Sequence, residues 1–182
     1  MYYALSQEQA VLTYEASSMV LKFHSGASYL SKFKARSRAG GHFFMSKDVS
    51  FPPPNGATLN IAHITKTVMS SATKAEIGEV YVNAREAVLA QKILDEMGHR
   101  QPRTPMQTDN SAAHSVVTNN VQPKRTKATG MSFYWLWCRN VQGQFRYYWR
   151  PGSQNWADYW TKHFPASHHI NAVYQVAFTL LG

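Results

Sequence analysis

The stretch Ser71–Gly98, SATKAEIGEVYVNAREAVLAQKILDEMG, decides the fold, because it predicts one long amphipathic helix in the middle of the chain. Ser70 or Ser71 can cap its first turn, and Gly98 suits the left-handed position that follows a helix C-terminus. Its apolar residues recur at intervals of three and four and form one stripe. The stripe consists of Ile77, Val80, Ala84, Ala87, Val88 and Leu94. Such a stripe requires a sheet or further helices to cover it.

The segments before this helix predict three strands. Apolar and polar residues alternate over Met19–His24, a period of two that is typical of a strand with one buried face. His42–Met45 is a second candidate, and Leu59–Val68, rich in Ile, Thr and Val, is a third. The polar, basic stretch Ser31–Gly41 separates the first two, and its final Gly-Gly pair is interpreted as a turn. Short connections of this kind predict antiparallel strands.

The segments after the helix alternate strand and helix. Arg103–Gln107 and Phe145–Arg150 are candidate strands, and two short helices are expected between them, at Ser111–Val117 and Met131–Cys138. A last helix should begin after Ser153 or Asn155 and run through His163. The predicted order is β-β-β-α-β-α-α-β-α. It favours an α/β domain with a mixed five-stranded sheet and helices on its faces, in which the later strands are parallel.

Composition limits the class of protein. The chain has 182 residues, which is typical of one domain, here expected over residues 18–169 with a lead at 1–17 and a tail at 170–182. Nineteen Lys and Arg against ten Asp and Glu give a net charge of +9, which favours a nucleic-acid partner. Cys138 is the single cysteine, so a disulfide framework and a cysteine-based zinc site are excluded. No membrane span and no signal peptide are expected, and the expected location is cytoplasmic or nuclear.

Three of the carboxylates stand at places where chemistry is possible. Glu76 lies early in the long helix, Asp109 follows a strand, and Asp158 begins the last helix. If the strand and helix ends meet at one edge of the sheet, these oxygens form a site suited to magnesium. The simpler alternative, which spacing alone favours, is that Glu76 and Asp158 complement helix N-termini and Asp109 starts a turn.

Two basic clusters are candidates for contacts to phosphates. The first contains Lys32, Lys34, Arg36 and Arg38, and the second contains Lys124, Arg125 and Lys127. Basic residues of this kind position a nucleic acid without reading its bases. Ordinary solvated loops are the alternative for either cluster alone. Both clusters are expected to flank the acidic residues.

Four segments resemble the ribonuclease H domains of copia-like retrotransposon polyproteins. They are Met69–Glu76 (MSSATKAE), Thr108–Ala112 (TDNSA), Pro123–Lys127 (PKRTK) and Asn155–Lys162 (NWADYWTK), in the family's order and spacing. The resemblance implies a ribonuclease H-like fold in which four carboxylates hold two Mg²⁺ ions and hydrolyse the RNA strand of RNA–DNA hybrids. It also implies a parent polyprotein with a reverse transcriptase part, and a cytoplasmic virus-like particle. Glu76, Asp109 and Asp158 match three of the four carboxylates.

The first carboxylate of that pattern is missing here. Where the family reads His-Ser-Asp-Ala-Ser-Tyr, this chain reads HSGASY over His24–Tyr29, so Gly26 stands at the aspartate position. No carboxylate lies between Glu15 and Asp48, and no near neighbour can replace the missing ligand. Magnesium binding and cleavage are therefore expected to be weak or absent. Three hypotheses follow: an active hybrid ribonuclease, a non-catalytic nucleic-acid-binding domain, and a decayed element fragment.

Overall fold

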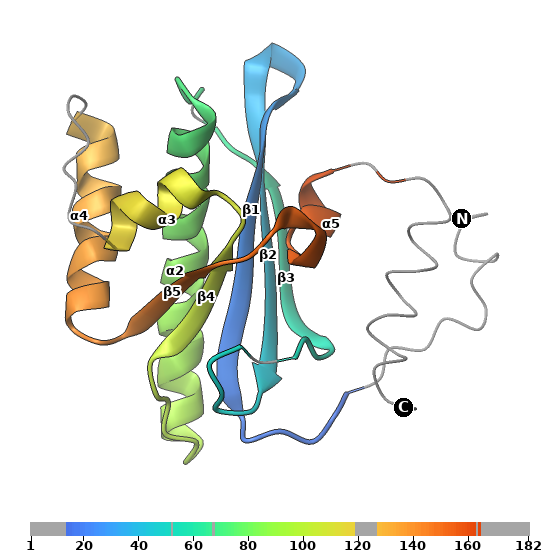
Figure 1. The fold of residues 1–182 in the computed structure, drawn as a ribbon, viewed down its shortest axis with the longest axis vertical. Helices are drawn as coiled ribbons and strands as arrows, with labels where there is room; N and C mark the ends of the chain where they lie inside the picture. The colour runs from blue at the N-terminus through green and yellow to red at the C-terminus, as the bar shows by residue number, and fades with distance from the viewer. Residues whose placement is uncertain (1–13, 52, 67, 119–126, 163, 165–182) are drawn as a thin grey trace.

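A five-stranded mixed sheet forms the centre of the molecule in the computed structural model, which describes residues 14–51, 53–66, 68–118, 127–162 and 164 (Figure 1). The strand order is β3-β2-β1-β4-β5. The strands are β1 (Val20–Lys32), β2 (Arg36–Ser46), β3 (Ala57–Ile64), β4 (Thr104–Thr108) and β5 (Phe145–Trp149). The first three strands pair antiparallel, whereas β1–β4 and β4–β5 pair parallel. The predicted mixed sheet and its order of elements are confirmed.

Helices cover both faces of this sheet. Helices α2 (Ala72–Glu96), α3 (Ser111–Thr118) and α4 (Lys127–Val141) lie on one side, and the short α5 (Asp158–Thr161) lies on the other (Figure 1). The apolar stripe of α2 packs on the sheet, where Ile77, Val80, Ala84 and Leu94 join Phe23, Phe43, Met106 and Phe145 in one buried cluster. The predicted stripe is thus the helix side of the core. Within the described residues, no helix is long and apolar enough to cross a membrane.

Both ends of α2 are set by local signals. The Ser71 side chain accepts a hydrogen bond from the Lys74 amide at 3.2 Å, which satisfies one of the free N–H groups of the first turn. Gly98 follows the helix with a φ of +89°, the left-handed conformation that glycine adopts without cost. These two residues confirm the bounds predicted for the helix.

The Gly40-Gly41 pair is not a turn, and this part of the sequence-based prediction is wrong. Both residues lie in the middle of β2, where Gly40 pairs with Gly26 and Gly41 with Ser25. A Cβ atom on Gly40 would lie 2.5 Å from the Ala157 carbonyl oxygen, and one on Gly41 would lie 2.5 Å from Asn83 Oδ1. The glycines are therefore required because α5 and α2 approach the two faces of β2 closely.

The true connection between β1 and β2 is a tight turn at Phe33–Ala35, in which Lys34 has a φ of +60°. The second strand is accordingly longer than the predicted His42–Met45, and β3 ends at Ile64 rather than Val68. The predicted last helix is also shorter: a single 3-10 turn at Gly152–Gln154 precedes α5, which ends at Thr161. His163, most of the lead and the whole of the tail lie outside the described residues.

Candidate carboxylate site

The Glu76 side chain connects α2 to the first strand. Its Oε1 accepts a hydrogen bond from the Ala27 amide at 3.0 Å. β1 pairs in parallel with β4 at Phe23 and His24. Ala27 lies beyond this pairing, so its amide can donate to a side chain of α2. Glu76 is buried, with 7% of its surface exposed. The Glu76 carboxylate therefore lies against the backbone of β1, next to position 26.

Asp109 and Asp158 both lie close to Gly152. A Cβ atom on Gly152 would be 3.0 Å from Asp109 Oδ2 and 3.4 Å from Asp158 Oδ2. Asp109 directly follows β4, and Asp158 is the first residue of α5. The two carboxylates thus approach the space that a side chain at position 152 would occupy.

Gly26 faces the same cluster. A Cβ atom built on Gly26 would lie 3.2 Å from Asp158 Oδ1, 3.2 Å from Asn155 Nδ2 and 3.5 Å from the Ala157 Cβ. Asn155 holds this arrangement together, because its Nδ2 donates to the Ser25 carbonyl at 3.0 Å. The structure thus brings Gly26, Glu76, Asp109 and Asp158 to one end of the sheet. Their role as metal ligands stays a prediction.

Electrostatics within this cluster are unfavourable without a cation. Burial, helped by the nearby charges of Asp109, Asp158 and Glu79, raises the pKa of Glu76 to about 8, against the opposing effect of the Ala27 amide. Burial also raises the pKa of Asp158, and the hydrogen bond from Lys162 opposes that change. Glu76 therefore carries a proton over much of the neutral pH range.

Lys162 was not among the residues predicted for the site. Its ammonium lies 2.6 Å from Asp158 Oδ2, although 46% of the lysine side chain is exposed. The pair has the i,i+4 spacing of acid–base pairs on helices, which is the sequence signal that would have found it. Lys162 supplies one positive charge directly to the acidic cluster.

Two oxygen atoms of the cluster fit a cation. Glu76 Oε2 and Asp109 Oδ1 are buried and have no hydrogen-bond partner in the described structure, and carboxylate oxygens are the ligands that Mg²⁺ prefers. The set is incomplete as it stands. Among the described residues, no group of three or more His, Cys, Asp or Glu side chains is arranged so that it could hold a metal ion.

The first basic cluster surrounds the β1–β2 turn, at the end of the hairpin that extends beyond the helices (Figure 1). Lys34 lies 5.9 Å from the centre of the Phe33 ring, and Arg36 Nε donates to the Phe33 carbonyl at 3.3 Å. Arg38, two residues before Gly40, is half-buried and its Nε is buried without a partner among the described residues. Arg38 is the member of this cluster nearest to Gly40 along β2, and the expectation that the cluster flanks the carboxylates stays a prediction.

Most of the second basic cluster falls outside the residues that the structure describes. Lys124 and Arg125 lie outside the described residues, and Lys127 is the first residue of α4. The expectation that this cluster flanks the carboxylates on their other side stays a prediction.

Comparison with solved structures identifies the fold. The chain is similar to the N-terminal RNase H domain of a Mycobacterium tuberculosis protein, solved as a fusion with maltose-binding protein, with a TM-score of 0.53 and 13% identity over 87% of this chain and 99% of that one. It is also similar to LC11-RNase H1 in complex with an RNA/DNA hybrid, with a TM-score of 0.55 and 8% identity over 78% of this chain and 93% of that one. LC11-RNase H1 was isolated from compost by a metagenomic approach. No protein-family profile and no curated protein matches the sequence. The chain therefore has the RNase H fold, as predicted.

Proposed function

We propose that this chain is a nucleic-acid-binding ribonuclease H-like domain of a copia-like retrotransposon polyprotein, in which hydrolysis of RNA–DNA hybrids is impaired. One observation carries the proposal: position 26, where a fourth carboxylate would face Asp158, is a glycine. The other three carboxylates converge on the same place. The chain thus combines the framework of a nuclease site with the loss of one ligand.

The chemistry of such a site depends on how many carboxylates hold the ions. Glu76, Asp109 and Asp158 would hold divalent cations, most directly through the unpaired oxygens of Glu76 and Asp109. When bound, a pair of Mg²⁺ ions activates the attacking water and stabilises the leaving oxygen of a phosphodiester. Gly26 offers no side-chain oxygen as a ligand, and Lys162 already neutralises part of the charge of Asp158. We infer that hybrid is bound and that turnover is very slow.

Charge supports a nucleic-acid partner. The chain carries a net charge of +9, and Lys32, Lys34, Arg36 and Arg38 surround the hairpin turn between β1 and β2. One solved structure with the same fold contains an RNA/DNA hybrid. The parent polyprotein would supply a reverse transcriptase part as the neighbouring partner. The same origin would place the domain in a cytoplasmic particle or in the nucleus.

The proposal is tested with a labelled RNA–DNA hybrid at increasing salt concentration, with and without Mg²⁺. Binding should weaken steeply as salt rises, with a log–log slope of about 0.9 for each phosphate contact on B-form DNA. Changing Lys32, Lys34, Arg36 and Arg38 together to Gln should flatten that slope, whereas changing the distant Lys92 to Gln should not. Cleavage by the unaltered chain should be close to background.

Two outcomes would contradict the proposal. Robust Mg²⁺-dependent cleavage by the unaltered chain, abolished by Asp109→Asn, would show that Gly26 does not impair the site. No salt-dependent binding to hybrid would favour the decayed-fragment hypothesis instead.

A further inference from the structure

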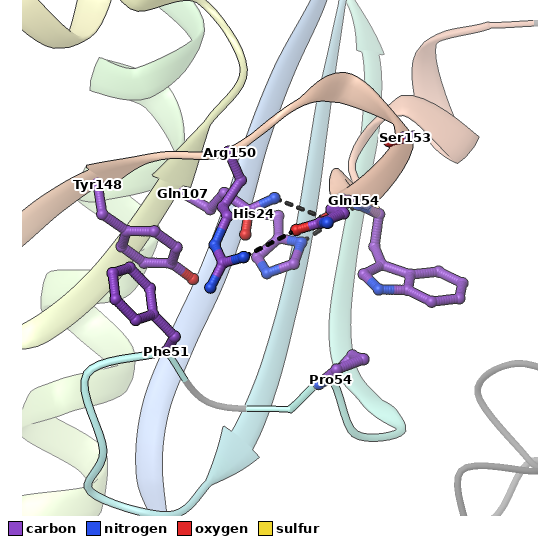
Figure 2. A pocket seen from close by; sticks show the side chains of 9 residues that line it. His24, Phe51, Pro54, Gln107, Tyr148, Arg150, Ser153 and Gln154 are labelled. Carbon is purple, nitrogen blue, oxygen red and sulfur yellow. Dashed lines mark hydrogen bonds between the residues drawn. The ribbon is translucent and has the colours of Figure 1, made fainter.

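A pocket of about 260 Å³ opens beside the carboxylate cluster and is used by none of the chemistry above (Figure 2). His24 and Gln107 contribute to it from neighbouring strands, where they pair in parallel register. They stand two residues before Gly26 and Asp109, respectively, on the same face of the sheet. Two residues of strand span about 6.6 Å, so the pocket is a direct neighbour of the carboxylates.

The polar groups at the base of this pocket have defined roles. The Trp156 amide donates to His24 Nδ1 at 3.2 Å, so a neutral His24 carries its proton on Nε2. Burial holds the pKa of His24 well below its ordinary value, which keeps the ring neutral. Gln107 Nε2 donates to the Gln154 carbonyl at 2.6 Å, which leaves Oε1 as an acceptor. Within the described residues, His24 Nε2 and Gln107 Oε1 make no other hydrogen bond, so the base of the pocket offers one donor and one acceptor.

Aromatic rings and one cation line the rest of the pocket. The Phe51 and Tyr148 rings pack edge to face with centres 5.6 Å apart, and the Arg150 guanidinium lies 4.5 Å from the Phe51 ring centre. Figure 2 shows the Arg150 side chain reaching between these rings and the His24 imidazole. Trp156 adds a further ring. No carboxylate is among the described residues that line the pocket, so Arg150 makes it positive.

The loop that carries Phe51 is held in place by two basic side chains. Lys22, fully buried on β1, donates through Nζ to the Lys47 carbonyl and to the Val49 carbonyl. Arg146 Nη2 donates to the Val49 and Ser50 carbonyls at 3.2 and 3.0 Å. These bonds fix the backbone just before Phe51. The aromatic wall is therefore built into the fold and does not depend on a ligand to form.

We propose that this pocket binds one unpaired nucleotide, with the polar edge of its base on His24 and Gln107, its phosphate on Arg150, which Gln154 Oε1 holds at 3.1 Å, and the rest of its surface against the aromatic rings of the wall. Every base has a π-face for aromatic side chains and carries hydrogen-bond donors and acceptors on its edge. A guanidinium is well suited to a phosphate. This inference goes beyond hybrid binding and requires neither a metal ion nor an active carboxylate site.

The test is a calorimetric titration of the full chain with AMP, GMP, CMP and UMP, in EDTA. Saturable one-to-one binding is expected for at least one nucleotide, together with weaker binding of the matching nucleoside. Arg150→Met should weaken the nucleotide about tenfold and leave the nucleoside unchanged, because it removes one charge-assisted hydrogen bond. Gln107→Leu and Phe51→Ala should weaken both ligands. Tyr134→Ala, an exposed aromatic change on α4, is the matched control and should have no effect.

Single-stranded oligonucleotides separate the two sources of a nucleotide. If the pocket serves a strand, Phe51→Ala should weaken an RNA octamer as strongly as it weakens the mononucleotide. If it serves free nucleotides, the octamer should be unaffected.

Thermal unfolding of each variant identifies any loss of fold, and Phe51 is 58% exposed, so its change should be tolerated. The proposal is overturned if no nucleotide binds, or if Arg150→Met and Phe51→Ala bind as the unaltered chain does. That failure would leave the hybrid-binding test unaffected, because EDTA removes the metal from this experiment.

Discussion

The ammonium of Lys162 lies 2.6 Å from Oδ2 of Asp158, so the acidic cluster contains a positive charge supplied by its own chain. Asp158 is the carboxylate that faces Gly26. A divalent cation at Asp158 would therefore meet a like charge at Oδ2, and beside Oδ1 it would lack the oxygen that an aspartate at position 26 would have offered. The site is weakened for metal binding in two independent ways, and each can be reversed separately.

Removal of the lysine charge should improve cation binding. In Lys162→Met, Mn²⁺ should bind about fivefold more tightly, a change of about 1 kcal/mol that suits a half-exposed charge. The measurement is a Mn²⁺ titration followed by electron paramagnetic resonance at pH 7.5. Lys92→Met removes an exposed lysine at a distant position of α2 and should leave the affinity unchanged. Weaker Mn²⁺ binding in Lys162→Met would show that the lysine supports the site.

Addition of the missing carboxylate should have a larger effect. Gly26→Asp should tighten Mg²⁺ binding at least tenfold and produce measurable cleavage of an RNA–DNA hybrid, because its side chain points at Asp158. The new Cβ would lie 3.2 Å from two atoms, so without metal the variant should lose about 1–3 kcal/mol of stability. Gly26→Asn has nearly the same shape without the charge and should bind Mg²⁺ no better than the unaltered chain. Equal Mg²⁺ affinity of the Asp and Asn variants would contradict the assignment of position 26.

Stability should fall as pH rises from about 6.5 to about 8, above the range in which the buried His24 and His42, whose pKa values burial lowers, oppose the change. The pKa of Glu76 is raised to about 8 and that of Glu79 to about 7 by burial, and the pKa of Asp158 is raised as well. In this range the folded state retains protons that the unfolded state has released, so deprotonation favours unfolding. Urea unfolding across this range should show the loss.

Glu76→Gln separates the contribution of Glu76 from that of its neighbours. This variant should be more stable than the unaltered chain at pH 8, by on the order of 1–3 kcal/mol, with a smaller difference at pH 5. Mg²⁺ at pH 8 should stabilise the unaltered chain more than Glu76→Gln. A stability that rises steadily toward pH 8 in the unaltered chain would contradict the raised pKa values.

Two glycine-to-alanine changes should have opposite effects. Gly40→Ala would place a Cβ 2.5 Å from a backbone oxygen of Ala157, which α5 can relieve only by moving away, so a loss of about 3 kcal/mol is expected. Gly130 lies in α4 with nothing within 4 Å of a new Cβ, so Gly130→Ala should gain about 1 kcal/mol of helix propensity. Urea unfolding of both variants under one condition measures the difference. A tolerated Gly40→Ala would show that α5 is not firmly seated.

The parts of the fold that depend on residues close together in the sequence were predictable from the sequence. Helix α2 has its cap at Ser71, its terminating glycine at Gly98 and its apolar period between them, all within one segment. The Gly40-Gly41 pair shows the opposite case. Its reason is the approach of Ala157 and Asn83 from other elements, and a local pattern cannot distinguish this from a turn.

In the candidate site, too, some residues were predictable from the sequence and others were not. The order of elements and the family resemblance pointed to Glu76, Asp109 and Asp158, and the structure does bring them together. The Lys162–Asp158 pair had a local signal in its spacing. The pocket had none, because its wall at Phe51 is positioned by Lys22 and Arg146, which hold the preceding backbone from strands β1 and β5.

The hydrogen bond from Asn155 to the Ser25 carbonyl joins residues 130 positions apart. During translation, β1 and β2 leave the ribosome long before α5 is made, so their α5-facing side stays without its cover until α5 follows. Gly26 and Gly40 are the residues exposed in this way, and they form a flat, side-chain-free strip on a nascent sheet. The carboxylate site is therefore assembled last, and prematurely terminated chains that end before residue 155 would display this strip to other nascent chains.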